Sequence, residues 1–122
     1  MKAVFNHCNI NVTNLEESIA FYKKALGLDV IKRKEAKDGS FILVYLSDGI
    51  SPFQLELTWL KDHPQSYELG ENESHICFHV DDYDSYHQLH QNMGCICFEN
   101  EAMGLYFIHD PDDYWFEIVA TQ

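Results

Sequence analysis

This 122-residue sequence has no lysine or arginine after Lys61. Residues 1–61 carry eight basic and seven acidic residues, a net charge of +1, whereas residues 62–122 carry 13 acidic residues and a net charge of −13. A chain with a formal charge of −12 is repelled by nucleic acid and by anionic membrane surfaces, so neither is an expected partner. The asymmetry favours either a solvated acidic face or contact between the first half of one chain and the second half of another.

Long apolar runs and export signals are also missing. No run reaches the roughly 18 residues of a membrane-spanning helix, and the first ten residues, MKAVFNHCNI, have no apolar core of signal-peptide length. The four cysteines form no CxxC pair and lie in apolar runs, which predicts buried, reduced thiols: Cys8, Cys77, Cys95 and Cys97. We therefore expect a cytoplasmic protein that does not associate with membranes.

An internal repeat organises the sequence. Residues 7–27 and 75–94 each start with a histidine in a strand pattern, reach a valine five residues later and end a helical pattern at a glycine. Thr13 or Asn14 can cap the first helix. Gly27 and Gly94 suit the left-handed conformation that ends a helix. Three strand patterns follow each helix, at 28–35, 41–47 and 53–59 and again at 95–99, 105–109 and 114–120.

Each copy therefore predicts the order βαβββ, and 46% hydrophobic residues are enough for a core. The modules cover about 4–60 and about 75–121, and the polar segment 61–74 links them. One such unit cannot cover both faces of its own sheet. We expect a single domain over 1–122 with an α+β fold, in which the tandem modules form a curved, incompletely closed mixed sheet with the helices outside.

Two glutamates stand inside apolar strands, in FQLELTW (53–59) and DYWFEIV (113–119). A carboxylate taken out of water without a partner costs several kcal/mol, so Glu56 and Glu117 each need one. Side chains alternate between the two faces of a strand. In four strands this alternation puts the following polar and aromatic residues opposite the apolar face: His7, Asn9, Asn11, Gln54, Glu56, Thr58, His75, Cys77, His79, Trp115 and Glu117.

Two imidazoles and two carboxylates on these faces predict a site for a divalent first-row metal ion, which would be the positive partner of both glutamates. The predicted ligands are His7, Glu56, His75 and Glu117. Among the other histidines, His79 is either a pocket residue near the metal or part of the core. His87 and His90 are expected on the solvated side of the second helix.

The sequence resembles the glyoxalase I (lactoylglutathione lyase) branch of the vicinal oxygen chelate superfamily over nearly its full length. The motifs that carry the resemblance are SIAFYKKALGL (18–28), LELT (55–58), YELG (67–70), HICFHVDD (75–82) and HDPDDYWFEI (109–118). The four predicted ligands fall on the family's metal positions. The resemblance implies the vicinal oxygen chelate fold and a homodimer, in which His7 and Glu56 of one chain meet His75 and Glu117 of the other. It also implies one divalent ion per site, with Ni²⁺ or Co²⁺ favoured and Zn²⁺ as the alternative.

The implied reaction converts the hemithioacetal of methylglyoxal and a thiol into an S-lactoyl thioester by proton transfer through an enediolate. By analogy Glu117 is the base, and Glu56 is a ligand and the second candidate for the base. The predicted substrate-binding residues share the ligand faces: Asn9, Asn11, Thr58, His79 and Trp115. Glutathione-using relatives tend to carry an arginine at the position of Asn11, an asparagine at that of Leu60 and a lysine in the late loop. This sequence has none of these, so the thiol cosubstrate stays open.

Three other readings share the fold. Acyl-CoA epimerases use the same enediolate chemistry with a similar ligand set. Metal-free resistance proteins bind cationic drugs in an acidic dimer cleft, although they need no set of four ligands. Iron oxygenases keep coordination positions open for oxygen, and a second glutamate would fill one of them.

Overall fold

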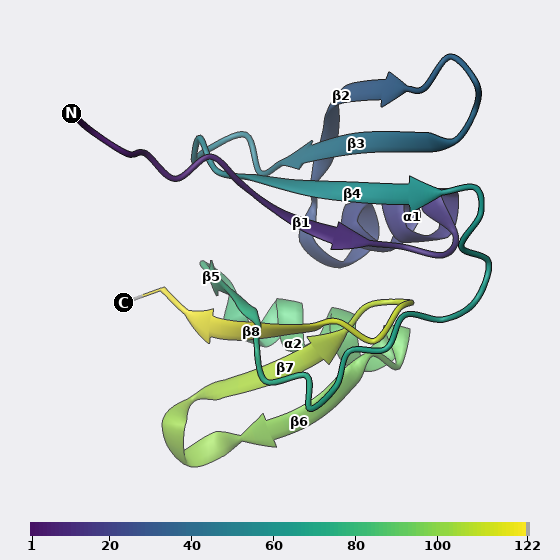
Figure 1. Ribbon diagram of the computed structural model, residues 1–122. Coiled ribbons are helices and arrows are strands. Elements are labelled where there is room, and N and C mark those ends of the chain that lie inside the picture. Colours follow the sequence, from purple (N-terminus) through teal and green to yellow (C-terminus); the bar gives the residue numbers. More distant parts are fainter. Residues whose placement is uncertain (122) are drawn as a thin grey trace. The chain divides into compact units, whose positions relative to one another are not determined.

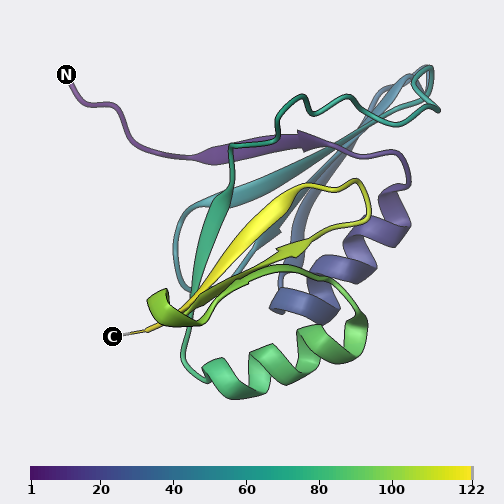
Figure 2. The same cartoon turned by 90° about the horizontal axis from the view of Figure 1, so that it is seen from below.

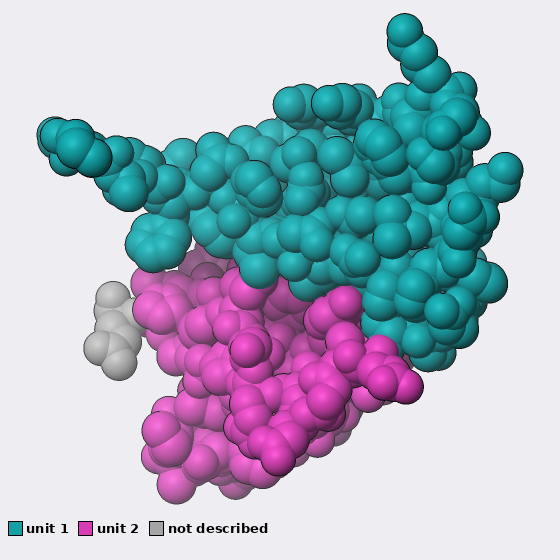
Figure 3. Space-filling view, in the orientation of Figure 1, with its two compact units in different colours: residues 1–67 teal, residues 68–122 magenta. Residues whose placement is uncertain are grey.

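The computed structural model describes residues 1–121 and divides them into two compact units, residues 1–67 and residues from 68 onward (Figure 3). The first unit contains β1 (His7–Asn11), α1 (Leu15–Leu26), β2 (Asp29–Glu35), β3 (Phe41–Ser47) and β4 (Gln54–Leu60). The second contains β5 (Ile76–Val80), α2 (Tyr83–Met93), β6 (Ile96–Asn100), the 3₁₀ helix η1 (Glu101–Met103), β7 (Leu105–His109) and β8 (Trp115–Ala120). The predicted βαβββ order is confirmed in both units.

Each unit forms one four-stranded mixed sheet. The strand order is β1-β4-β3-β2 in the first unit and β5-β8-β7-β6 in the second, as can be followed in Figure 1. The first strand of each unit runs parallel to the last, and the other neighbours are antiparallel. Each sheet also has a register shift in the strand that follows its helix. The shift lies between Val30 and Lys32 in β2 and between Ile96 and Phe98 in β6. The α+β fold with two mixed sheets agrees with the expectation from the sequence.

The helices begin and end where the sequence predicted. The Asn14 side chain accepts a hydrogen bond from the Glu17 amide at 3.1 Å, so Asn14 rather than Thr13 caps α1. Asp82 caps α2 in the same way through the Ser85 amide. Gly27 and Gly94 end the two helices with φ of 66° and 68°, a left-handed conformation that other residues adopt at a cost.

Each helix lies against one face of its own sheet (Figures 1 and 2). The face that packs under α1 is apolar, and its members are almost fully buried: Ile10, Val12, Val44, Leu46, Leu55 and Leu57. In the second unit the corresponding core is Val80, Tyr106, Ile108, Phe116 and Ile118. Full burial of an aliphatic or aromatic side chain of this size contributes about 1.5–3 kcal/mol. The opposite face of each sheet is therefore the one left for polar residues.

Two expectations were wrong. His90 is fully buried rather than solvated, because its Nδ1 lies 2.7 Å from the hydroxyl of the buried Tyr106 under α2. His87, one turn earlier, pairs with Glu99 on β6. Of the four cysteines, which are all free thiols, only Cys95 is buried, and Cys77 is exposed because it lies on the polar face of β5.

The helices of residues 1–121 are all too short or too polar to cross a membrane.

Candidate metal centre

The first histidine–glutamate pair lies on the polar face of the first sheet. In the parallel pairing of β1 with β4, Asn9 is opposite Glu56, and His7 lies two residues earlier on the same face. His7 Nε2 is 3.8 Å from Glu56 Oε1. The Glu56 side chain is 12% exposed and that of His7 is 39% exposed, so the pair is open to solvent mainly on the histidine side.

The second pair repeats this geometry in the second unit. Cys77 is opposite Glu117 in the pairing of β5 with β8, and His75 again lies two residues earlier. His75 Nε2 is 3.5 Å from Glu117 Oε1, and the side chains are 38% and 20% exposed. The structure thus brings each predicted histidine to the predicted glutamate of its own unit.

The other ring nitrogen of each histidine is occupied. His75 Nδ1 lies 3.2 Å from the backbone carbonyl oxygen of Glu73, and His7 Nδ1 lies 2.6 Å from the Asn6 side-chain oxygen. These oxygens can only accept, so each Nδ1 donates the hydrogen bond and Nε2 is the ring nitrogen that faces the carboxylate. Histidine ligands are commonly oriented in this way by a hydrogen bond from the second nitrogen.

A proton on Nε2 or a metal ion can bridge each nitrogen–oxygen pair, and the distances test the second case. Ligand atoms about 2.1 Å from one ion are separated by about 3.0–3.4 Å at coordination angles between octahedral and tetrahedral. The observed 3.5 and 3.8 Å lie slightly above this range. Imidazole and carboxylate are also the donors that first-row divalent ions accept. The residues present therefore fit a divalent metal.

Each pair by itself is an incomplete site. Within residues 1–121, no three histidine, cysteine, aspartate or glutamate side chains come close enough together to hold a metal ion. Two protein ligands are fewer than the three or four found in zinc sites of enzymes. Each unit thus brings together two of the four predicted ligands.

The residues predicted to contact substrate are divided between the two units. The first unit contains Asn9, Asn11 and Thr58, and the second contains His79 and Trp115. Asn9 bonds both of its neighbours on the polar face, because its Nδ2 donates to Asn11 Oδ1 at 2.9 Å and its Oδ1 accepts from the Thr58 hydroxyl. These two bonds link the three side chains into one row beside the His7–Glu56 pair. His79 is exposed at the far end of β5. Trp115 is half-buried, with its ring 5.6 Å from that of Phe107.

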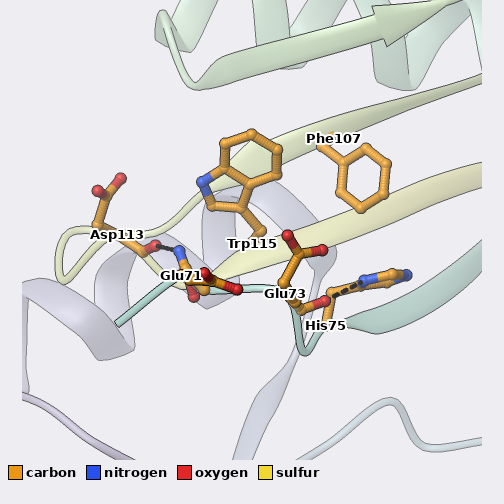
Figure 4. A pocket seen from close by; sticks show the side chains of 7 residues that line it. Glu71, Glu73, His75, Phe107, Asp113 and Trp115 are labelled. Carbon is orange, nitrogen blue, oxygen red and sulfur yellow. Dashed lines mark hydrogen bonds between the residues drawn. The ribbon is translucent and has the colours of Figure 1, made fainter. Parts of the chain in front are cut away.

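A pocket of about 440 Å³ opens beside His75 in the second unit (Figure 4). Its lining residues are Glu71, Asn72, Glu73, His75, Phe107, Asp113 and Trp115. Asn72 closes one side by donating a hydrogen bond to the Asp113 carbonyl oxygen at 2.8 Å. Asp113 has a φ of 73°, the left-handed conformation that aspartate tolerates better than most residues. The pocket combines two aromatic walls with three carboxylates next to the candidate ligand.

Two neighbours of the glutamates did not emerge from the sequence, and for a third, Cys77, the sequence predicted the polar face but not its place opposite Glu117. Tyr45 is opposite Glu56 on β3, and Phe107 is opposite Glu117 on β7. A hydrogen bond from the Tyr45 hydroxyl to Glu56 is the main cause that raises the pKa of Tyr45. Partial desolvation of the sulfur, and then the hydrogen bond to Glu117 and its charge, raise the pKa of Cys77 to about 11. All three contacts depend on which residues are opposite each other on neighbouring strands. The alternation of side chains within one strand does not give this register.

Comparison with known proteins decides the family. Residues 4–118 match the model of the Glyoxalase/Bleomycin resistance protein/Dioxygenase superfamily. The chain belongs to this superfamily. It is 32% identical over 124 residues to the lactoylglutathione lyase of Neisseria meningitidis serogroup A, which covers 95% of this chain and 89% of that protein.

Solved structures agree with this assignment. The trypanothione-dependent glyoxalase I of Leishmania major matches with a TM-score of 0.85 and 28% identity, over 98% of this chain and 87% of that one. The fosfomycin resistance protein FosX of Listeria monocytogenes, solved with Mn(II), has the same fold at 19% identity, with a TM-score of 0.79 over 100% of this chain and 95% of that one. The resemblance to the glyoxalase I branch is confirmed, and the chain is a lactoylglutathione lyase-like enzyme with the vicinal oxygen chelate fold.

Proposed function

We propose that this enzyme is a metal-dependent glyoxalase I, which converts the hemithioacetal of methylglyoxal and a thiol into the S-lactoyl thioester. The observation that carries the proposal is the repeated arrangement in which a histidine Nε2 faces a glutamate oxygen on the polar face of each sheet, at 3.8 Å in one unit and 3.5 Å in the other. The donor types and their spacing are those of metal ligands, and the glyoxalase I relatives supply the reaction.

The two pairs together make one site in this proposal. Each pair provides two ligands, and both are needed for the four protein donors of a complete set. We place His7 and Glu56 of one chain with His75 and Glu117 of the partner subunit, in a homodimer of chains that are each a single glyoxalase domain. The opposite charges of the two halves, +1 and −13, favour such a pairing.

In this proposal the bound ion, Glu117 and Glu56 have different roles in the reaction. A bound divalent ion, Ni²⁺ or Co²⁺ in preference to Zn²⁺, supplies Lewis acidity to the substrate oxygens. The Glu117 carboxylate takes the proton from the carbon that carries the sulfur and returns it to the neighbouring carbon. The first carbon becomes the thioester carbonyl and the second the hydroxyl-bearing carbon, so the reaction is an isomerisation that needs no redox partner. Glu56 stays as a ligand.

The thiol is recognised beside His75. The pocket there offers Phe107 and Trp115 to apolar parts and carboxylates to a positively charged group such as an amine. It has no lysine or arginine to hold the carboxylates of glutathione, and neither Asn11 nor Leu60 supplies a positive charge. Glutathione is therefore the first thiol to test rather than the assigned one.

The test is thioester formation from methylglyoxal and glutathione by metal-free protein that has been reconstituted with Ni²⁺, Co²⁺ or Zn²⁺. Rapid turnover with nickel or cobalt and little with zinc supports the proposal in full. Stoichiometric metal binding without turnover would reject glutathione and direct the assay to other thiols and to acyl-CoA epimerisation. Protein that binds no divalent metal would overturn the proposal and favour a metal-free binding protein.

A further inference from the structure

The polar face of the first sheet carries a lysine at its edge. The strand pairings place one residue of each strand in a line across this sheet: Asn9, Glu56, Tyr45 and Lys32. Residues directly opposite each other on neighbouring strands share a face. Lys32 therefore lies on the same face as the His7–Glu56 pair, and it comes from the edge strand β2 (Figure 1).

The Lys32 side chain lies over this face. Lysines on an edge strand commonly block pairing with another chain, a role that needs only an ammonium group in water. Here the Nζ atom is 5.2 Å from the centroid of the Tyr45 ring, in a cation–π contact. The same ring meets the His7 ring edge-on, with centroids 5.8 Å apart at 85°. Tyr45 thus contacts both the ammonium group and a candidate metal ligand.

Within residues 1–121 the Lys32 ammonium group has no acidic partner. Arg33, the next residue, belongs to the opposite face and pairs with Glu16 at 3.5 Å and with Glu35 at 3.1 Å. Lys34 lies on the polar face again, and none of the ion pairs of residues 1–121 includes it. In a chain with a net charge of −12, these two lysines make the edge of the polar face a place for an anion.

The second sheet has a different residue at the equivalent position. Phe98 on β6 is opposite Phe107, as Lys32 is opposite Tyr45. The Phe98 and Phe107 rings have centroids 6.1 Å apart, and Phe98 is 49% exposed. One sheet therefore offers a cation beside its histidine–glutamate pair and the other offers an aromatic surface. A substrate with a charged part and an apolar part would bind to these two faces in one orientation.

We propose that Lys32 selects the thiol cosubstrate by binding a carboxylate of that thiol. The inference rests on the proposed function, because it names a substrate class for the same site. Lys32 and Glu56 lie two strands apart, about 10 Å between their backbones. A carboxylate one or two residues from a cysteine lies within about 7 Å of it along a peptide, so this group and the lysine side chain together can span that distance. The phosphates of an acyl-CoA lie beyond the whole pantetheine arm and do not match it.

Lys32→Met tests the proposal, because it removes the charge and keeps the length of the side chain. We expect KM for the hemithioacetal of methylglyoxal and glutathione to rise about 5- to 20-fold at unchanged kcat, as for one lost charge-assisted hydrogen bond at an exposed site. Lys32→Arg keeps the cation and should keep most of the affinity. The matched control is Lys24→Met, which should change neither constant, because Lys24 is exposed on α1 and α1 covers the opposite face of the sheet (Figure 1).

Two probes show whether the carboxylate is what Lys32 binds. Glutathione diethyl ester has neutral esters in place of both carboxylates, so Lys32→Met should leave its KM nearly unchanged. S-methylglutathione cannot react, and its Kd should rise in Lys32→Met by the same factor as the KM of glutathione. The difference in Kd between the two proteins should shrink as the salt concentration is raised.

The outcomes separate this inference from the proposed function. Equal Kd values for S-methylglutathione in the unmodified protein and in Lys32→Met would overturn the role of Lys32. An equal rise in KM for glutathione and its diester, or no binding of S-methylglutathione by the unmodified protein, would overturn it as well. Binding of S-methylglutathione that depends on Lys32, in a protein that forms no thioester, would overturn the proposed function and support the carboxylate site.

Discussion

Replacement of Glu117 by glutamine should stop turnover while leaving the protein folded. Glutamine has nearly the same volume as glutamate, and the side chain is 20% exposed at the polar face, so no cavity forms in the core. We expect the free energy of unfolding to change by less than about 1 kcal/mol. Removal of a general base lowers kcat by about 10²–10⁴, which corresponds to about 3–5 kcal/mol of transition-state stabilisation.

The assay is thioester formation at saturating metal, with metal affinity measured separately by titration of the metal-free protein. Glu117→Gln should retain much of the metal affinity, because the amide oxygen still faces the ion. Glu16→Gln, at a side chain that is 76% exposed, is the control for the loss of a carboxylate elsewhere. Near-normal kcat in Glu117→Gln at full metal occupancy would refute the assignment of the base.

Three further predictions concern stability. Leu57→Ala and Ile118→Ala remove fully buried side chains at equivalent positions of the two sheets, so each should cost about 2–5 kcal/mol in urea denaturation, and a loss below 1 kcal/mol at both would contradict the packing. Tyr106→Phe should cost about 1–3 kcal/mol in the same assay, because it removes the buried bond to His90, and an unchanged midpoint would contradict that bond. Burial is the main cause that raises the pKa of Cys97 from its usual 9.0 to about 11, and the charges of Asp113 and Cys95 add to it. As the pH rises, the unfolded chain therefore loses this proton before the folded protein does. The free energy of unfolding should fall between pH 9 and 11. Cys97→Ser should flatten that fall, and an equally steep profile would contradict the shifted pKa.

The histidine–glutamate pairs could be predicted from the sequence because they depend on two local rules. Alternation along a strand assigns each side chain to a face, and the repeat places a histidine and a glutamate at corresponding points of both copies. Strand bounds also came within a residue of the structure, since glycines and polar turns mark them. The predictions that depend only on neighbours in sequence were therefore confirmed for the fold.

The contacts that could not be predicted from the sequence involve residues that are distant from each other in the chain. Tyr45 and Phe107 matter because β3 and β7 lie next to the glutamate strands in a particular register, and a single strand pattern carries no register. His90 appeared solvated because its partner, the Tyr106 hydroxyl, comes from a strand 16 residues away. The joining of the two pairs into one metal site stays a prediction, since it depends on the assembly of the chains.

Subunit complementation tests that site most directly. One chain carries His7→Ala with Glu56→Gln, the other carries His75→Ala with Glu117→Gln, and neither should bind metal or form thioester alone. In a mixed dimer with shared sites, one of the two sites contains only unmodified ligands, so random exchange should restore about one quarter of the unmodified activity and of its metal binding. No recovery, in dimers shown to be mixed, would contradict the shared metal site.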